Sequence, residues 1–460
     1  MIDLGHLEKY HENNRIEAKK ALGGLPHSIW ETYSAFANTL GGLILLGVEE
    51  YRDKSFHPVD LPDPEALVRE FRELINQPGK ASVNILTAKD VVIEEVNGCH
   101  IVVIQVPRAL RRDKPVYVDG DLRNSYRRSG EGDYRCAPEE IEAMLRDAAV
   151  RTQDMQVLQD MTTEALCRKT LNRYRACVEQ VRPGSLPEAL SMDEFLVQAG
   201  AAETGEDGVV RPNCAGLLMF GKPAAITTVY PDFRLEYREE DKRNVFDFCE
   251  NVLARMKGSL PVPALFPAVQ EALANCLVNA DYLSGPVIIE MNAESISLSN
   301  PGVFRIGIDT AKNGGLSDPR NSTMMKLFQL ADIGEGTGSG VPGIFRISRE
   351  LGLKEPVISE SLHPDRTTLS LSFEKVADPA SKKRSAGLSR QKSDDPRVKE
   401  RQKNDIILFL TDQIAASASE IAKHLNISVS RTNELLAALL KEEIVVTDGT
   451  GKNKKYRLRS

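Results

Sequence analysis

The chain has 460 residues, of which 41% are hydrophobic, 27% are charged and 6% are aromatic, and its formal net charge is −7. This length predicts roughly two to four domains, and the balanced composition excludes a chain that is fibrous or disordered throughout. The negative charge argues against a protein that coats nucleic acid along its whole surface. Contact with nucleic acid would therefore use local basic patches.

No run of residues approaches the roughly 20 apolar positions that a membrane-spanning helix needs. Residues 1–10 are polar and lack the apolar centre of a secretion signal. We therefore expect a cytoplasmic protein with no membrane partner.

Residues 1–150 are predicted to form an α/β domain, because helical and strand-like apolar patterns alternate along them. The expected helices cover residues 26–38, 65–75 and 138–149. The expected strands cover residues 43–48, 83–86, 91–95 and 100–106.

A second α/β region is predicted for residues 151–376. Its main helix is expected at residues 266–279, and Ser191 and Glu194 have the spacing of a capping box that begins another helix. Its strands are expected at residues 232–237, 287–291, 295–299 and 367–373.

Residues 377–404 are rich in basic and small polar side chains and predict a flexible linker. Residues 405–460 show three helical patterns followed by a hairpin, which indicates a small winged helix-turn-helix domain. The helices are expected at residues 405–411, 419–424 and 429–443, and the hairpin strands at residues 444–447 and 454–458. The predicted fold class is thus a multidomain α/β (α+β) protein.

Four separated motifs stand in order in the first domain: E-A-K at 17–19, A-F-A-N-T-L-G-G-L-I-L-L-G-V-E-E at 35–50, P-V-Y at 115–117 and Y-R-R-S-G at 126–130. Together they resemble the Schlafen AlbA-type domain. The resemblance implies nucleic-acid binding, and in some Schlafen proteins this domain is a metal-dependent RNA endonuclease that uses three carboxylates.

The endonuclease carboxylates would fall on Glu12, Glu17 and either Glu49 or Glu50. Oxygen ligands of this kind suit Mg²⁺ or Mn²⁺, so the resemblance implies a metal held by Glu12, Glu17 and Glu50. Ala18 replaces the phenylalanine of the usual E-F-K motif. The alternative is that these acids only flank a groove in a domain that binds without cutting.

Basic residues crowd the end of the first domain, with tyrosines between them. The candidates for phosphate contact are Arg111, Arg112, Arg127 and Arg128. Arginine donates two hydrogen bonds to one phosphate, and tyrosine can stack on a base. The alternative is a surface loop whose charge is balanced by the acids around it.

The second region carries E-A-L-A-N at 271–275, S-N-P-G at 299–302, D-P-R-N at 318–321 and G-E-G-T-G-S-G at 334–340. This order resembles the GHKL-type ATPase module and implies an α/β sandwich that binds ATP. The resemblance makes Glu271 a general base and Asn275 a magnesium ligand. The nucleotide contacts would be Asn275, Asn279, Asn300, Gly302, Gly336, Gly338 and Gly340.

The glycine-rich string would fold over phosphates, because its N–H groups can approach them without a Cβ in the way. Asn300 stands where active GHKL enzymes carry the aspartate that reads the adenine amino group. The alternative is a helix with small buried polar residues and glycines that merely turn the chain.

In the last domain, Ser428, Ser430, Arg431 and Asn433 lie near the start of the expected recognition helix, and Lys454 and Lys455 lie on the expected wing. These positions meet bases and phosphates in winged helix-turn-helix proteins. The alternative is a winged helix used for protein contact.

Two functions remain. We expect first a DNA-binding transcriptional regulator, a homo-oligomer whose middle domain senses a nucleotide or dimerises. The alternative is a Schlafen-like metal-dependent endonuclease that acts on RNA or single-stranded nucleic acid, in phage defence. The sequence leaves open whether the target is DNA or RNA.

Overall fold

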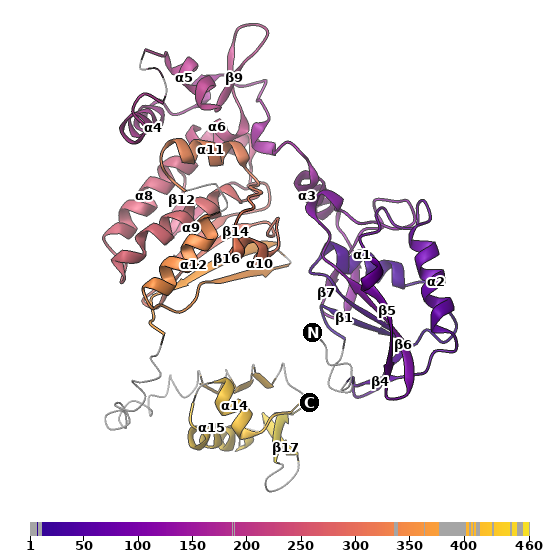
Figure 1. The fold of residues 1–460 in the computed structure, drawn as a ribbon. Coiled ribbons are helices and arrows are strands. Elements are labelled where there is room, and N and C mark those ends of the chain that lie inside the picture. Colours follow the sequence, from indigo (N-terminus) through magenta and orange to yellow (C-terminus); the bar gives the residue numbers. More distant parts are fainter. Residues whose placement is uncertain are drawn as a thin grey trace. The chain divides into compact units, whose positions relative to one another are not determined.

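The computed structural model (Figure 1) describes residues 7, 12–185, 187, 189–334, 339–362, 364–376, 402–403, 406–407, 409–410, 415–425, 427–441, 444–448 and 454–459. Contacts divide the chain into two compact units, Met1–Val376 and Ala377–Ser460. The first unit holds an N-terminal region (residues 12–150) and a middle region (residues 151–376). No helix among these described residues is long and apolar enough to cross a membrane.

The N-terminal region is built on a four-stranded sheet with strand order β1-β2-β6-β5. Only β1 and β2 pair in parallel. The elements are β1 (Ile16–Lys19), α1 (Ile29–Asn38), β2 (Gly42–Leu46), β3 (Val48–Glu50), β4 (Phe56–Pro58), α2 (Pro64–Ile75), β5 (Val91–Val96), β6 (Cys99–Val106), β7 (Tyr126–Ser129), β8 (Gly132–Arg135) and α3 (Pro138–Ala148).

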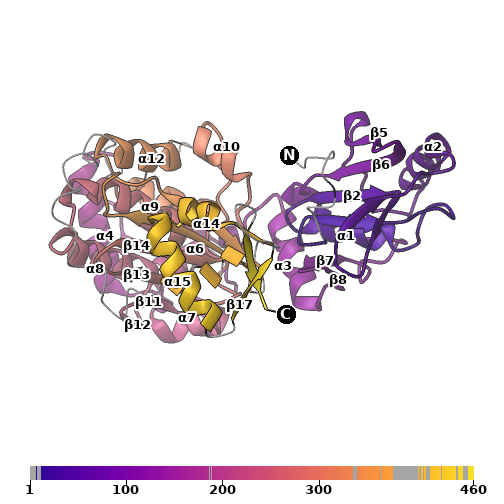
Figure 2. The ribbon, with the colours of Figure 1, turned by 90° about the horizontal axis from the view of Figure 1, so that it is seen from below.

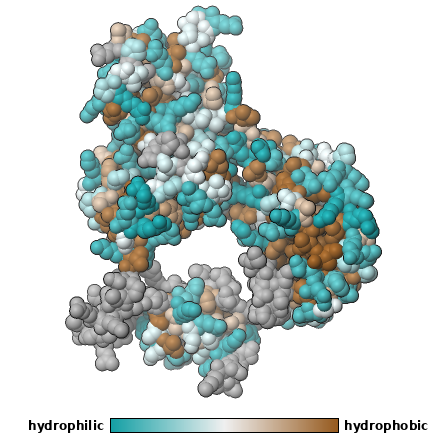
Figure 3. All heavy atoms as spheres, viewed as in Figure 1, coloured by the Kyte–Doolittle hydropathy of each residue, from teal (hydrophilic) through white to brown (hydrophobic). Residues whose placement is uncertain are grey.

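Both faces of this sheet carry an apolar core, because successive side chains of a strand point to opposite faces. Ile44 and Leu46 of β2 pack in one core with α1 and α2, whereas Leu45 belongs to the other core. In Figure 3 a hydrophobic area is visible on this region. The exposed apolar side chains of the N-terminal region include Val92 and Ile93 of β5.

The expected elements at residues 65–75, 91–95, 100–106 and 138–149 are confirmed. The first helix begins at Ile29, three residues later than expected. The strand predicted at 83–86 is wrong, because the Tyr33 hydroxyl binds the backbone there instead of a neighbouring strand. It donates to the carbonyl of Val83 and accepts from the N–H of Ile85.

The middle region contains a six-stranded sheet of order β12-β11-β13-β14-β16-β15. Its elements are α4 (Arg168–Val181), α5 (Met192–Ala199), β9 (Ala202–Thr204), β10 (Val210–Pro212), α6 (Cys214–Phe220), α7 (Pro223–Val229), β11 (Leu235–Tyr237), β12 (Glu239–Asp241), α8 (Val245–Lys257), α9 (Phe266–Val278), β13 (Val287–Met291), β14 (Ser295–Pro301), α10 (Ile308–Asn313), α11 (Ser322–Leu330), α12 (Gly340–Glu350), β15 (Val357–Ser361) and β16 (Arg366–Ser372).

Helix α9 is the central helix of this region: it packs on β14 and contacts α8, α11 and α12 (Figure 1). Leu273 and Leu277 of α9 are fully buried in the core with Ile296 of β14. The predictions of α9, β13, β14 and β16 are confirmed. Of the strand expected at residues 232–237, only the last three residues form a strand, which is β11. The predicted capping box also forms at the start of α5, because the Ser191 hydroxyl accepts from the N–H of Glu194 and the Glu194 carboxylate accepts from the N–H of Ser191.

The last unit has two fully described helices and a hairpin: α14 (Ala418–His424), α15 (Val429–Lys441), β17 (Val445–Asp448) and β18 (Lys455–Leu458) (Figure 2). Ile421, Leu435 and Leu439 are buried together with Tyr456. Part of the helix expected at 405–411 is helical, and most of the expected linker lies outside the described residues. The mixed α/β class with several sheets is thus confirmed.

Candidate nucleotide pocket and nucleic-acid surfaces

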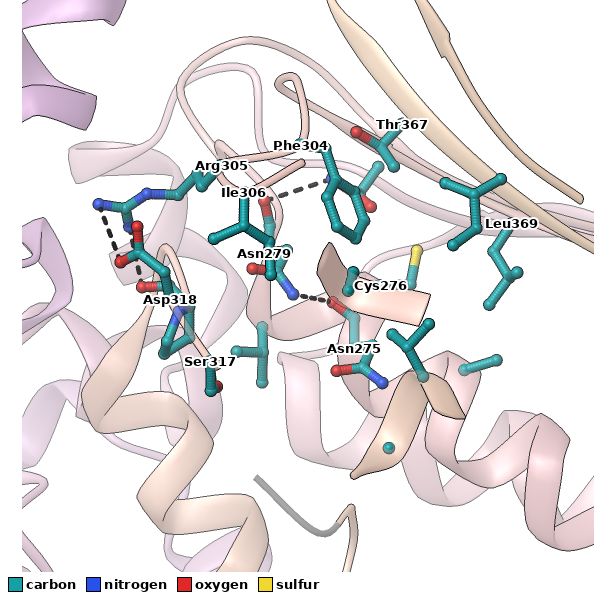
Figure 4. A pocket seen from close by; sticks show the side chains of 18 of the residues that line it. Asn275, Cys276, Asn279, Phe304, Arg305, Ile306, Ser317, Asp318, Thr367 and Leu369 are labelled. Atoms are coloured by element: carbon teal, nitrogen blue, oxygen red, sulfur yellow. Dashed lines mark hydrogen bonds and ion pairs between the residues drawn. The ribbon is translucent and has the colours of Figure 1, made fainter. Parts of the chain in front are cut away.

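A pocket in the middle region lies between α9, β14 and the segment that follows β14 (Figure 4). Apolar side chains form much of its wall: Val278, Leu298, Ile306, Leu316, Ile358 and Leu369. Glu271, Asn275 and Asn279 bring polar groups to it from α9 and its end. An apolar wall with a few convergent polar groups is typical of a small-molecule site.

The three polar residues from α9 share one face of the helix, because they are four positions apart. The Asn275 amide donates to Glu271 Oε1 at 3.0 Å, and the Asn279 amide donates to the carbonyl of Asn275 at 2.9 Å. All three are partly buried. The structure thus brings together three residues that the sequence predicts to act in one nucleotide site.

Gly340 also lines this pocket, but as the first residue of α12. A Cβ at Gly340 would lie 1.9 Å from Glu271 Oε1, so only glycine lets this helix approach the carboxylate so closely. The expectation of a loop through Gly340 is therefore corrected: the chain is helical from that residue onward. Gly336 and Gly338 lie outside the described residues.

Asn300 lies on β14, lines the pocket and is only 5% exposed. Its amide nitrogen donates to the carbonyls of Asn279 (3.2 Å) and Pro301 (3.0 Å). Both amide hydrogens are thereby used, which leaves the side-chain oxygen as the acceptor for a ligand.

Gly302 follows with a φ of +93°, and a Cβ there would lie 2.5 Å from the Arg320 guanidinium. Glycine therefore lets Arg320 pack directly against this turn.

Further residues of the pocket were not singled out from the sequence, among them Phe304, Arg305 and Thr367. In Figure 4 the Phe304 ring points into the pocket, and Arg305 extends toward Asp318. The Arg305 side chain is 4% exposed, and burial lowers its pKa, although Asp147 and Asp318 act against that shift. No periodic pattern marks this stretch, so only the D-P-R-N motif at its end drew attention to it.

In the N-terminal region, three of the four candidate carboxylates influence one another. Burial, followed by the charge of Glu17 and then Glu50, raises the pKa of Glu12. Glu12 also accepts a hydrogen bond from the N–H of Ala18 at 3.1 Å. Glu49 instead pairs with Lys20 at 3.0 Å on the exposed surface.

The environment of Glu17 does not fit the metal site that the resemblance implies. Its two oxygens lie 2.8 Å from Lys19 Nζ and 2.8 Å from Arg128 Nη2, so cationic side chains already neutralise it. Among the residues that the structure describes, no group of three or more His, Cys, Asp or Glu side chains could hold a metal ion. The geometry therefore does not support a metal shared by Glu12, Glu17 and Glu50.

Arg127 and Arg128 are 6% and 1% exposed, which contradicts the expectation that they present donors to phosphate. Arg127 pairs with Glu140 (3.0 Å) and Asp365 (2.6 Å). Arg128 pairs with Asp133 (2.9 Å) as well as Glu17. Internal carboxylates, several of them distant in sequence, thus take the place of the expected phosphates.

The other two candidate arginines differ from each other. Arg111 donates to Asp318 at 2.5 Å and is partly buried. The Arg112 side chain is 74% exposed and lies 3.9 Å from Asp113. Arg123 is also free to solvent, with a side chain that is 85% exposed beside Asp121.

In the last unit, the candidates for DNA contact mostly lie on the surface. Ser428, Ser430 and Asn433 are exposed around the start of α15. Arg431 is half-buried, with its guanidinium bound to Glu434 and Gln402. Lys454 and Lys455 are exposed at the start of β18.

Comparisons with known proteins match three family models along the chain. Residues 12–137 match "Schlafen, AlbA_2", residues 142–236 match "Domain of unknown function (DUF8451)", and residues 285–370 match "Putative ATP-dependent DNA helicase recG C-terminal". No curated protein matches the chain.

Two solved structures are similar to parts or all of the chain. The DIP2311 protein from Corynebacterium diphtheriae is 17% identical, with 97% of this chain and 95% of that one covered and a TM-score of 0.39. The N-terminal domain of a putative ATP-dependent DNA helicase RecG-related protein from Nitrosomonas europaea is 32% identical, with 30% of this chain and 95% of that one covered and a TM-score of 0.24. The chain thus belongs to the Schlafen AlbA_2 family, and its AlbA_2 domain is followed by the DUF8451 region and a domain of the RecG C-terminal type.

Proposed function

We propose that the protein is a nucleic-acid-binding regulator, of the transcription-regulator type, whose GHKL-like middle domain senses an adenine nucleotide. The AlbA_2 match at residues 12–137 and the RecG C-terminal match at residues 285–370 support a role with nucleic acid. The RecG-type match also supports an ATP-binding domain. A pocket with an apolar wall and a polar face on α9 supports a nucleotide ligand.

The observation that carries the nucleotide proposal is the orientation of the Asn300 amide. Its nitrogen is held by two backbone carbonyls, so its oxygen is the group left to bind a ligand. Adenine has an amino group at C6, which can donate to this oxygen, whereas hypoxanthine and guanine carry a carbonyl oxygen there. An amide can therefore replace the aspartate of active GHKL enzymes in selecting adenine.

Asn275 would hold Mg²⁺, and Glu271 would orient an attacking water. Glu271 accepts from Asn275, and the first turn of α12 reaches it at Gly340. Backbone N–H groups at the start of α12, which has 11 residues, would face the phosphates. Bound Mg²⁺ would neutralise phosphate charge.

Calorimetric titration with Mg²⁺ and ATP, GTP or ITP tests this site. We expect ATP to bind at least tenfold more tightly than ITP, a difference of about 1.4 kcal/mol. Asn300→Leu should abolish that preference and Asn300→Asp should keep it, whereas Glu290→Ala, an exposed change on β13, should have no effect. Equal affinity for ATP and ITP, or no binding of ATP, would contradict the proposal.

We further propose that α14, α15 and the hairpin form a winged helix-turn-helix that binds duplex DNA. The exposed Ser428, Ser430 and Asn433 would face the major groove, and Lys454 and Lys455 would contact phosphates. Replacing both lysines by alanine should weaken duplex binding and reduce its salt dependence by up to two counterions. Lys441→Ala, at the far end of α15, is the matched control. An unchanged salt slope would assign this unit to protein contact.

A metal-dependent nuclease is the second candidate: it would need Glu17 to leave Lys19 and Arg128, and one buried carboxylate oxygen favours it. Among the described residues, Glu50 Oε1 is buried without a hydrogen-bond partner, and Glu12 lies close enough to feel its charge. Incubation with RNA and Mn²⁺ tests this function. Cleavage that disappears in Glu50→Gln would support it, whereas no cleavage by the wild-type protein would remove it.

A further inference from the structure

One wall of the nucleotide pocket is a segment with little regular structure. It supplies Val303, Phe304, Arg305, Ile306, Ala311, Leu316, Ser317, Asp318 and Pro319 to the lining. Within residues 303–319, all of them described, only α10 is helical. A segment with few backbone hydrogen bonds of its own opens easily unless other groups hold it.

Arg108, which follows β6 in the AlbA_2 domain, holds the beginning of this segment. Its Nη2 donates to the carbonyl of Phe304 at 2.9 Å, and its Nη1 donates to Glu360 at 2.7 Å. Glu360 in turn accepts from the N–H of Phe304 at 2.7 Å. The pair of Arg108 and Glu360 therefore holds both the N–H and the carbonyl of Phe304, whose ring points into the pocket.

Arg111, also from the AlbA_2 domain, holds the end of the segment. Its Nε donates to Asp318 at 2.5 Å, and its Nη1 donates to the carbonyls of Asp147 (2.8 Å) and Ala149 (3.0 Å). Both side chains are only about a quarter exposed, at 26% and 25%. Partial burial shields this ion pair from the salt screening that weakens surface pairs.

A third link runs through α3 toward the proposed adenine-reading residue. The Asp147 carboxylate accepts from Arg320 Nε (2.8 Å) and Nη2 (2.7 Å). Arg320 also donates to the carbonyls of Asn279 and Val303. The Asn279 carbonyl is one of the two that hold Asn300. Asp147 is thus connected to Asn300 through Arg320 and one carbonyl.

We propose that Arg108 and Arg111 of the AlbA_2 domain, together with Asp147 of α3, position the wall of the nucleotide pocket, so that nucleotide binding and the contact between the AlbA_2 domain and the middle region are energetically coupled. The inference rests on the nucleotide site proposed above. Because coupling is reciprocal, a nucleotide that orders residues 303–319 also strengthens their hold on the AlbA_2 domain.

Hydrogen exchange and calorimetry on the full chain test this coupling in the variant with Arg108→Ala and Arg111→Ala. We expect faster exchange in residues 303–319 without nucleotide and an ATP Kd raised roughly 5- to 150-fold, the usual range of coupling. ATP should slow exchange near residues 108–113 in the wild-type protein. Arg112→Ala, next to Arg111 but 74% exposed, should change none of these quantities.

Unchanged exchange in β13 would show that the double variant is still folded. Unaltered exchange of residues 303–319 in that variant would overturn the inference, and so would an unchanged ATP Kd despite faster exchange. Failure of the wild-type protein to bind ATP would instead refute the nucleotide site. The exchange measurement alone would then decide whether the AlbA_2 domain holds the segment.

Discussion

Arg128 shows how a residue with the character of a phosphate ligand can serve the fold instead. Its guanidinium lies between Glu17 and Asp133 and donates to the carbonyls of Asn13 and Ile16. The run Tyr126-Arg127-Arg128 suggests a surface patch in the sequence, because nothing local reveals the distant carboxylates. Burial of an arginine depends on partners from other segments, which a basic pattern cannot show.

Arg128→Met should therefore destabilise the protein by about 3 kcal/mol, because it removes the buried cation that Glu17 and Asp133 share. Arg123→Ala, at a side chain that is 85% exposed, should leave the unfolding free energy nearly unchanged. Urea unfolding measures both. Similar free energies for the two variants would show that the Arg128 network contributes nothing.

Glu12 gives a pH-dependent prediction. Its pKa is raised above 4.5 in the folded protein by burial and by Glu17 and Glu50, so the charged form costs stability at neutral pH. Glu12→Gln keeps an acceptor for Ala18 and should raise the Tm at pH 7. The gain should vanish below pH 4.5, where Glu12 is protonated in both states. Glu49→Gln is the control, and a lower Tm of Glu12→Gln at pH 7 would contradict this electrostatic account.

At the scale of elements, regular patterns predicted helices and strands well. Helices α2 and α9 and strands β6, β13 and β16 lie within a residue or two of the expected bounds, because their apolar residues repeat at the period of the element. The strand at 83–86 failed because one distant hydroxyl, on Tyr33, takes its backbone bonds. Helix α12 was missed because glycines at its start read as a loop.

Gly340 tests how closely α12 must approach α9. Gly340→Ala would place a methyl group 1.9 Å from Glu271 Oε1 and displace the carboxylate, so we expect the ATP Kd to rise at least tenfold, about 1.4 kcal/mol. Gly343→Ala in the same helix meets nothing within 4 Å and should leave the Kd unchanged. Calorimetry compares them, and equal affinities would show that Glu271 needs no such contact.

At the scale of the whole molecule, the sequence was sufficient to identify the AlbA_2 and ATPase-type domains from separated motifs. It predicted that Glu271, Asn275 and Asn300 belong to one site, because one motif contains Glu271 and Asn275 and a second motif contains Asn300. The contacts of Arg108 and Arg111 with residues 304, 318 and 360 could not be predicted. They depend on how two domains pack, and no motif contains that information.

We propose that one protein both binds DNA and senses adenine nucleotide. The most direct test is binding of a labelled DNA duplex by the full chain at fixed salt, with and without saturating Mg²⁺ and ATP. We predict that ATP changes the duplex Kd at least fivefold in the wild-type protein, the lower end of usual coupling, and has no effect in Asn300→Leu. A duplex Kd that ATP leaves unchanged in the wild-type protein, or no duplex binding at all, would show that the protein is not a nucleotide-responsive DNA-binding regulator.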